Sequence, residues 1–483
     1  MEKVSDNRQS VTSVTMDSKG QKLNLKREVG LVGAVSLIAG TMIGSGIFMS
    51  PQSVLFNIGS PGASLVVWAC CGLLAILASL CYAELGTVIQ ESGGEYIYIL
   101  KTSGPVVAFM LIFSSVLFVR PAGVAGMALS FSEYVVAPFY LDCKPPVQVV
   151  KCVAATAIIV LATVNCLNVR FSMSVQVFFM VAKVLALVVI VIGGVVFLIT
   201  GQANTFEDSF ENTNWGISPI GIAFYQGLWS YDGWNNLNSV TEELKRPEVT
   251  LPRALLIAIS MVTVLYLLVN VSYFAVLTPR ELMTSSAVAV TWGNKVLGGW
   301  GWIMSVAAAL SAFGSLNGSF FSGGRVCFVA AREGHMPDIL AMAHVHKLTP
   351  SPALIFTTII SLLVLIPGDF QSIVNFFSFT AWFFYGITLS GLLYLKIKKP
   401  ELPRPYKVPI VIPILVLIAA VGLVLAPIVD NPQIEYLYVT LFVFSGVLVY
   451  VPFIHYKLCP GLLRKVTIFL QLFLEVAPAE KNL

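Results

Sequence analysis

Residues 31–56 read LVGAVSLIAGTMIGSGIFMSPQSVLF, an apolar run with Gly40, Gly44 and Gly46 near its middle. A helix needs roughly 20 apolar residues to cross about 30 Å of hydrocarbon, so the run is long enough to span a bilayer. Two interpretations of its glycines are open. Membrane helices use glycine for close packing, or the glycines mark a point where a transporter helix is broken.

The composition indicates that the chain lies in a lipid bilayer. Hydrophobic residues make up 57% of the 483 residues, charged residues make up 11%, and the mean hydropathy is +0.84. Soluble domains carry about 25% charged residues, so this chain has too few polar groups to cover a water-exposed surface. We therefore predict an all-α polytopic membrane protein. The net charge of +4 is too small to indicate a nucleic-acid partner.

Apolar runs predict twelve transmembrane helices. Lysine and arginine gather in the N-terminal segment and in alternate connections, which places both termini in the cytoplasm. Residues 1–28 are polar and lack the apolar core of a cleavable signal peptide, so we expect a disordered cytoplasmic tail. The expected spans are 30–57, 63–89, 106–137, 148–168, 172–200, 218–244, 254–278, 295–328, 352–367, 372–396, 408–428 and 433–455.

A second interruption lies in the sixth span, GIAFYQGLWSYDGWNNLNSVTEEL (221–244), where Gly227 and Gly233 bracket a polar, aromatic centre. The two interruptions are five spans apart, and matched broken helices in two halves are typical of inverted-repeat transporters. This spacing favours broken helices over simple packing. We expect a 5+5 inverted repeat with discontinuous helices 1 and 6. Its parts are 29–200 (helices 1–5), 201–397 (helices 6–10), 398–456 (helices 11–12) and a cytoplasmic amphipathic segment, 457–483.

The predicted break in the first helix has the polarity that an amino acid needs. Amides there lack intrahelical partners and stand at the positive end of the following half-helix, where a carboxylate is favoured. Unwound carbonyls of the first half-helix and of residues 229–231 suit an ammonium group. A ligand that carries both groups on one carbon is an α-amino acid. The predicted contacts are Thr41, Ile43, Gly44, Ser45 and Gly46.

The break in the sixth span carries candidates for side-chain selection. Asp232, beside Tyr231, is ionisable at membrane depth, which points to function. It either receives a cationic substrate side chain or caps the half-helix that would start at Gly233. Trp229 and Trp234 flank the break, and an aromatic residue there either closes over the substrate as a gate or packs against its neighbours.

Lys183 is surrounded by apolar residues in QVFFMVAKVLALVVIVI (176–192). Its ammonium group could take the place of a sodium ion held by unwound carbonyls, so that transport needs no sodium gradient. It could also snorkel to an interface, or form a buried ion pair. Lys183 lies roughly 16 Å past the start of its span, by the rise of a helix, which favours a mid-membrane position and the first interpretation.

Four further features of the sequence each leave two interpretations open. Of eight cysteines, Cys143 in the loop FYLDCKPP is the one expected outside the cell, where it forms an intermolecular bridge or stays a free thiol. Arg120 either pairs with a carboxylate or faces a water-filled vestibule, and Glu84 is either part of a gate or an ordinary interfacial charge. Residues 461–478 form either an interfacial helix or a dock against the transporter body.

No enzyme site is expected. The sequence has no nucleophile and base in a recognisable arrangement, and its four histidines lack metal-ligand spacing, so we predict neither a metal nor a cofactor.

Six motifs together resemble one family, the light subunits of heteromeric amino acid transporters, within the amino acid–polyamine–organocation superfamily. The resemblance covers about residues 25–480, and the Tyr-Asp-Gly string of the sixth span is most similar to b(0,+)-type light chains. The motifs are GTMIGSGIFMSP (40–51), CYAELGT (81–87), SGGEYIYIL (92–100), AFYQGLWSYDGWNNLNSVTEEL (223–244), REGHMP (332–337) and RPYKVP (404–409).

The resemblance implies a sodium-independent exchanger in the plasma membrane, including the apical face of epithelia. It would take up cationic amino acids and cystine in exchange for neutral amino acids by alternating access. The alternatives are a light chain selective for large neutral or acidic amino acids, and a proton-coupled symporter. The implied roles are substrate backbone contacts at Ile43, Gly44, Ser45 and Gly46, a gate at Trp229, cation recognition at Asp232, a site-lining position at Asn235, sodium-site replacement at Lys183, and a disulfide from Cys143 to a single-span glycoprotein heavy chain similar to rBAT.

Overall fold

The computed structural model describes residues 30–91, 93–167, 169–201, 206–346, 349–429 and 431–478. The predicted tail, 1–28, and the last five residues of the predicted C-terminal segment lie outside the described residues. Within the described residues, nine helices are long and apolar enough to cross a membrane, or up to ten with the bent pair of the first span. The chain is therefore an all-α polytopic membrane protein with one small strand pair.

The first half of the chain is helical and apolar throughout its spans. Its elements are α1 (Leu31–Met42), α2 (Gly46–Ile58), α3 (Pro61–Val88), α4 (Glu95–Ser103), α5 (Pro105–Ser114), the π-helix η1 (Ser115–Val119), α6 (Arg120–Val136), η2 (Ala137–Phe139), α7 (Val147–Leu167) and α8 (Val169–Ile199). The segment from Pro105 to Phe139 acts as one span, because η1 continues α5 into α6 without a break.

The second half adds the remaining spans and the strand pair. Its elements are α9 (Ile217–Ser230), the 3₁₀-helix η3 (Asn236–Glu243), α10 (Pro247–Val276), α11 (Pro279–Thr284), α12 (Val288–Val296), η4 (Gly298–Trp300), α13 (Trp302–Arg332), η5 (Asp338–Ala341), β1 (Met342–His344), α14 (Ser351–Leu365), α15 (Phe370–Lys398), α16 (Val411–Val429), α17 (Ile434–Tyr450), η6 (Val451–His455), α18 (Pro460–Leu474) and β2 (Val476–Pro478).

The expected sixth and ninth spans are the ones that fall short of a full crossing by length. The sixth is divided between α9 and η3, and the ninth is the 15-residue helix α14. Twelve spans and the inverted repeat therefore remain predictions.

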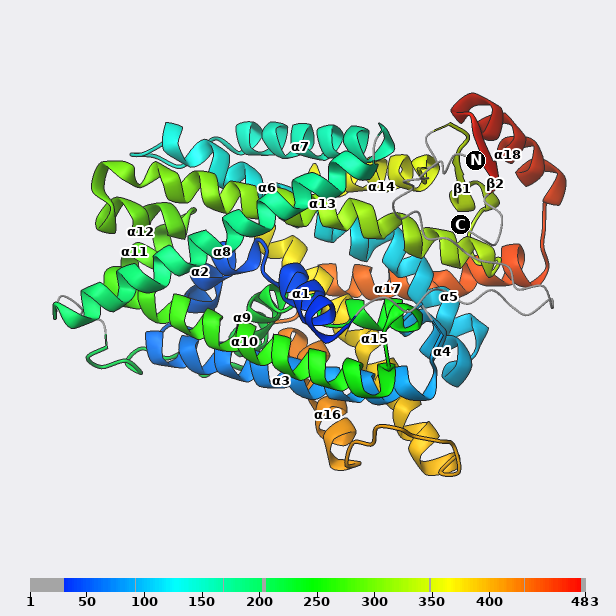
Figure 1. Cartoon of the computed structure of the whole chain (residues 1–483), viewed down its shortest axis with the longest axis horizontal. Coiled ribbons are helices and arrows are strands. Elements are labelled where there is room, and N and C mark those ends of the chain that lie inside the picture. The colour runs from blue at the N-terminus through cyan, green and yellow to red at the C-terminus, as the bar shows by residue number, and fades with distance from the viewer. Residues whose placement is uncertain are drawn as a thin grey trace, which may run out of the picture.

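The long helices pack side by side around the two short, interrupted ones. Helix α10 packs against α3, α1 and α8, α13 packs against α6 and α8, and α2 packs against α9. Figure 1 shows the short helix α1 crossing the middle of the bundle in front of longer helices. This arrangement surrounds the interruptions with apolar packing, so their backbone polar groups are held away from water.

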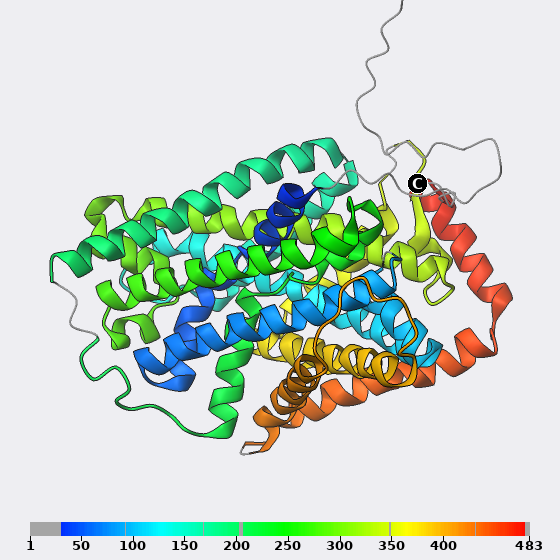
Figure 2. The same cartoon turned by 60° about the horizontal axis from the view of Figure 1, so that its bottom comes forward.

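The C-terminal segment is attached to the bundle by backbone hydrogen bonding. Strand β2 pairs antiparallel with β1, with Met342 opposite Pro478 and His344 opposite Val476. Helix α18 lies at one end of the bundle in Figure 2 and exposes apolar residues, which include Phe469 and Leu472. The predicted amphipathic segment is thus an exposed helix followed by a strand that joins it to the loop after α13.

Candidate functional site

The first predicted interruption is present. Helix α1 ends at Met42, α2 begins at Gly46, and the two are bent by 51°. The Ile43 amide donates to the Ala39 carbonyl at 3.0 Å, so it is used within the helix and the expectation of a free amide there is wrong. None of the described residues accepts a hydrogen bond from the amides of Gly44, Ser45 or Gly46. Three of the four expected donors thus remain available at the positive end of α2.

The second interruption differs in form from the prediction. Helix α9 ends at Ser230, residues 231–235 form turns, and the chain continues as a 3₁₀-helix from Asn236. Gly233 has φ +105°, a conformation that side chains rarely adopt. No side chain caps this 3₁₀-helix, so the interpretation of Asp232 as a cap of a half-helix starting at Gly233 is not supported.

The two interruptions lie face to face. A Cβ atom placed on Gly46 would lie 2.6 Å from the Ser230 Cα, and one placed on Gly233 would lie 2.7 Å from the Thr41 Cγ2. The hydroxyl of Tyr266 in α10 lies 2.8 Å from the Met42 carbonyl and 2.9 Å from the Ser230 carbonyl, so it can donate to either. Tyr266 lies in an apolar run, and no motif there marks it as a site residue.

Lys183 contacts the last turn of α1, just before the first break. Its side chain is 2% exposed, and its ammonium group donates to the Gly40 carbonyl at 3.2 Å and to the Ser315 hydroxyl at 3.3 Å. No carboxylate among the described residues forms an ion pair with it. The structure thus disfavours both the ion-pair and the interfacial interpretations, and it places a fixed positive charge beside a carbonyl in the last turn of α1.

The two tryptophans have different surroundings. Trp229 packs edge-on against Phe377 and Phe370 of α15, with ring centroids 5.0 and 6.1 Å away. Trp234 packs against Tyr82 and Tyr385, at 4.7 and 5.2 Å. Both tryptophans are buried. Aromatic packing therefore describes both tryptophans in this structure, and the interpretation of Trp229 as a gate stays a prediction.

Polar side chains gather at the turn of the sixth span. The Asn235 amide donates to the carboxylate of Glu95, the first residue of α4. The charges of Asp232 and Glu95 both interact with that of Arg120, but no carboxylate among the described residues forms an ion pair with it, so both interpretations of Arg120 stay open. Sequence reasoning did not assign Glu95, although it lies in the quoted motif SGGEYIYIL.

A family model for amino acid permeases matches residues 29–453. The chain belongs to the amino acid permease family. It is 49% identical over 461 residues to the human (Homo sapiens) b(0,+)-type amino acid transporter 1, covering 95% of each chain. It is 42% identical over 470 residues to the human cystine/glutamate transporter, covering 96% of this chain and 93% of that one.

A third relative broadens this set. The permease is 44% identical over 416 residues to the human large neutral amino acids transporter small subunit 2, covering 85% of this chain and 77% of the relative. All three relatives are named as transporters. The permease is therefore a multi-pass membrane transporter and not an enzyme.

Glu84 of this permease is a buried ion-pair partner. Its side chain is fully buried, with one carboxylate oxygen 2.9 Å from the Lys396 ammonium and 3.4 Å from the Arg404 guanidinium. Its other oxygen accepts from the Val408 amide at 3.3 Å. The interpretation as an ordinary interfacial charge is wrong, and the contact joins the motifs CYAELGT and RPYKVP.

Cys143 of this permease is exposed in the connection between η2 and α7. The thiols of Cys70, Cys152 and Cys459 are exposed as well. Exposure alone therefore does not distinguish Cys143, and its assignment depends on the side of the membrane on which it lies.

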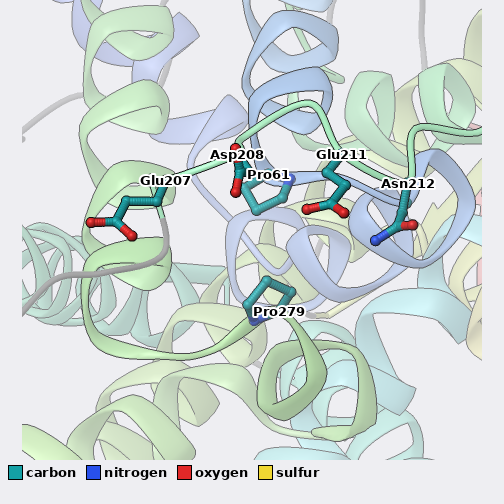
Figure 3. Close-up of a pocket in the computed structure, with 7 residues that line it drawn as sticks. Pro61, Glu207, Asp208, Glu211, Asn212 and Pro279 are labelled. Atoms are coloured by element: carbon teal, nitrogen blue, oxygen red, sulfur yellow. The ribbon is translucent and has the colours of Figure 1, made fainter.

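A surface pocket lies apart from the interruptions. It has a volume of ≈ 240 Å³, and Figure 3 shows the three carboxylates that line one side of it. It is reached at Gly59, which follows the 13-residue helix α2, roughly 20 Å from Gly46 by the rise of a helix. It contains none of the predicted site residues. Its lining is Gly59, Pro61, Glu207, Asp208, Glu211, Asn212 and Pro279.

Proposed function

We propose that this permease is a sodium-independent exchanger that takes up cationic amino acids and cystine and releases neutral amino acids by alternating access. The observation that carries the proposal is the pair of interruptions in contact. One offers the free amides of Gly44, Ser45 and Gly46, and the other carries Asp232. The 49% identity to a relative named b(0,+)-type amino acid transporter 1 supports the substrate class.

The polarity of the interruptions orients an α-amino acid. Its carboxylate binds the free amides at the positive end of α2, where the helix dipole favours negative charge. Its ammonium group binds the carbonyls of Met42 and Ser230. In this structure both carbonyls lie within hydrogen-bond distance of the Tyr266 hydroxyl. A cationic side chain is then directed to Asp232, and Tyr231 and Asn235 complete that side of the site.

Trp229 closes the site as a gate in this proposal. Its ring already packs against Phe377 and Phe370 of α15. A small rotation of α15 relative to α9 would change this contact and uncover the substrate. Such relative movement of packed helices is a general route to alternating access.

The same polarity explains why the transporter exchanges. Without substrate, the free amides of the first interruption are buried in a low-dielectric interior, which is costly. Repacking the interruptions while these donors are unpaired is therefore unfavourable, whereas a bound amino acid pairs them. The transporter then changes conformation when loaded, and each uptake step requires a release step.

Lys183 supplies a fixed charge in place of sodium. Its ammonium group, bound to the Gly40 carbonyl and the Ser315 hydroxyl, holds positive charge beside the first interruption without a dissociable ion. Transport coupled to a sodium gradient needs a site that the ion can leave, and a covalently attached ammonium cannot leave.

Exchange in proteoliposomes tests this proposal. We expect arginine uptake in sodium-free buffer to require leucine inside the vesicles and to be unchanged when sodium is added. Uptake into amino-acid-free vesicles at the same rate, or uptake that requires sodium, would overturn the proposal. Uptake driven by a pH gradient without internal leucine would instead indicate the proton-coupled symporter.

The partner in this proposal is a single-span glycoprotein heavy chain similar to rBAT, joined through a disulfide to Cys143. The name of a relative as a small subunit supports it, and Cys143 is the exposed thiol expected outside the cell. The heterodimer would lie in the plasma membrane with both termini of the permease in the cytoplasm.

A further inference from the structure

Glu95 enters the turn of the sixth span from a separate element. It is the first residue of α4, which lies outside the candidate membrane spans. Its carboxylate accepts a hydrogen bond from the Asn235 amide, which follows Asp232 by three residues. The carboxylate is therefore fixed beside the turn, although 140 residues of sequence separate the two partners.

Three charged side chains share this region. Asp232 and Glu95 are acidic, Arg120 is basic, and each interacts electrostatically with the other two. All three are partly exposed, whereas the surrounding rings of Tyr82 and Trp234 are buried. The charged groups thus border accessible space at a place where aromatic rings exclude solvent from other directions.

The charges of this triad do not cancel. One guanidinium offsets one of the two carboxylates, which leaves one negative charge when both acids are ionised. An unbalanced charge is costly where the effective dielectric constant is low, and a ligand of opposite charge relieves that cost. A single cationic side chain has the charge that completes the triad.

We propose that Glu95 is a specificity-determining residue that, with Asp232 and Arg120, sets one negative charge at the substrate site and so selects monocationic side chains. This inference rests on the proposed exchange function. In it Asp232 receives the substrate cation, Arg120 offsets the second carboxylate, and Asn235 holds Glu95 in place.

A purely structural role for Glu95 is the competing explanation. An acidic residue in the first turn of a helix is favoured by the helix dipole, and Glu95 occupies that position in α4. Glutamine separates the two roles, because its side-chain oxygen still accepts from the Asn235 amide while the negative charge is removed. Aspartate keeps the charge on a shorter side chain.

The test is competition between labelled arginine and leucine in exchange-loaded proteoliposomes. For E95Q we expect the ratio of arginine to leucine uptake to fall about tenfold, since one negative charge near the substrate cation is lost, with leucine uptake retained. E95D should keep most of the arginine preference. E91Q is the matched control, because Glu91 is exposed and pairs with Lys101 near the same helix.

The outcomes distinguish the two proposals. If wild-type protein exchanges arginine and E95Q keeps the wild-type ratio, Glu95 does not set specificity and the proposed exchange function stands. If wild-type protein does not exchange arginine at all, the proposed function fails first. If E95Q loses leucine uptake to the same extent as arginine uptake, its role is structural.

A pH profile provides a second measurement. Burial raises the pKa of Glu95 to about 7, against the hydrogen bond from Asn235, which lowers it. Glu95 is then ionised above that pH and neutral below it, so the wild-type ratio of arginine to leucine uptake should rise between pH 6 and pH 8. The other titratable groups that interact with Glu95 are the same in the wild type and in E95Q. They are Asp232, Arg120, Tyr82 and Tyr385. A profile as steep in E95Q as in wild type would overturn the inference.

Discussion

Selectivity depends on single charged side chains that lie where water is scarce. Asp232 is partly exposed at a turn whose neighbours Tyr231 and Trp234 are buried. A carboxylate in such surroundings binds a cation more strongly than one in water, because the effective dielectric constant is lower. Lys183 shows the opposite case, since its charge is fixed to a carbonyl and a hydroxyl and is not offered to a ligand.

Replacing Asp232 by asparagine tests the assignment of cation recognition. The amide has nearly the same shape but no charge, so we expect arginine kcat/KM to fall by at least about tenfold while leucine exchange persists. The measurement is initial uptake of each amino acid into leucine-loaded proteoliposomes. Arginine uptake that survives unchanged beside normal leucine uptake would contradict the assignment.

At the element scale, the break in the first helix could be predicted and the form of the second could not. Gly40, Gly44 and Gly46 interrupt an apolar run, and the helix ends at Met42, between the first two of these glycines. After Gly233 the chain forms a 3₁₀-helix, and hydrophobic periodicity does not separate a short 3₁₀ segment from an α-helix.

Site residues from elements that are distant in the sequence were not predicted either. Tyr266, Ser315 and Glu95 reach the interruptions from α10, α13 and α4. Their roles depend on which helices pack together. A single sequence does not show which helices are neighbours, so these contacts could not be predicted from it. Glu84 escaped for the same reason, because its partners Lys396 and Arg404 are more than 300 residues away.

Gly46 allows the start of α2 to lie against the end of α9. A Cβ atom at Gly46 would lie 2.6 Å from the Ser230 Cα, and backbone cannot move aside as a side chain can. We expect G46A to force α2 and α9 apart, to cost roughly 1–3 kcal/mol of stability, and to abolish most exchange.

The measurements are thermal stability in detergent and arginine–leucine exchange. G422A in α16 is the control, because a Cβ atom there meets nothing within 4 Å. Normal exchange and stability in G46A would show that the interruptions are not in close contact.

At the scale of the whole molecule, buried polar contacts connect segments that hydrophobic packing alone would leave independent. Glu84 joins α3 to α15 through Lys396, and to the connection between α15 and α16 through Arg404. Removing one partner of a buried ion pair leaves an uncompensated charge, which typically costs about 3–5 kcal/mol. The strand pair of β1 and β2 likewise holds the C-terminal segment on the loop after α13.

The proposed disulfide from Cys143 to a heavy chain can be tested directly. Replacing Cys143 by serine should remove a disulfide-linked species of higher mass on non-reducing gels after expression with a single-span glycoprotein heavy chain. The reason is that Cys143 is exposed in the loop expected outside the cell, where the conditions are oxidising. Exchange activity should persist in any non-covalent complex that remains, because Cys143 lies in a loop and not among the residues assigned to the interruptions.

Cys152 provides the matched control for this experiment. Its thiol is also exposed, and it lies in α7, nine residues after Cys143 and in the half of a span expected near the same membrane face. A side chain within a membrane span faces lipid or a neighbouring helix, so C152S should leave the linked species intact. Loss of the linked species in C152S but not in C143S would move the bridge to Cys152. Its persistence in both variants would refute a covalent link through either thiol.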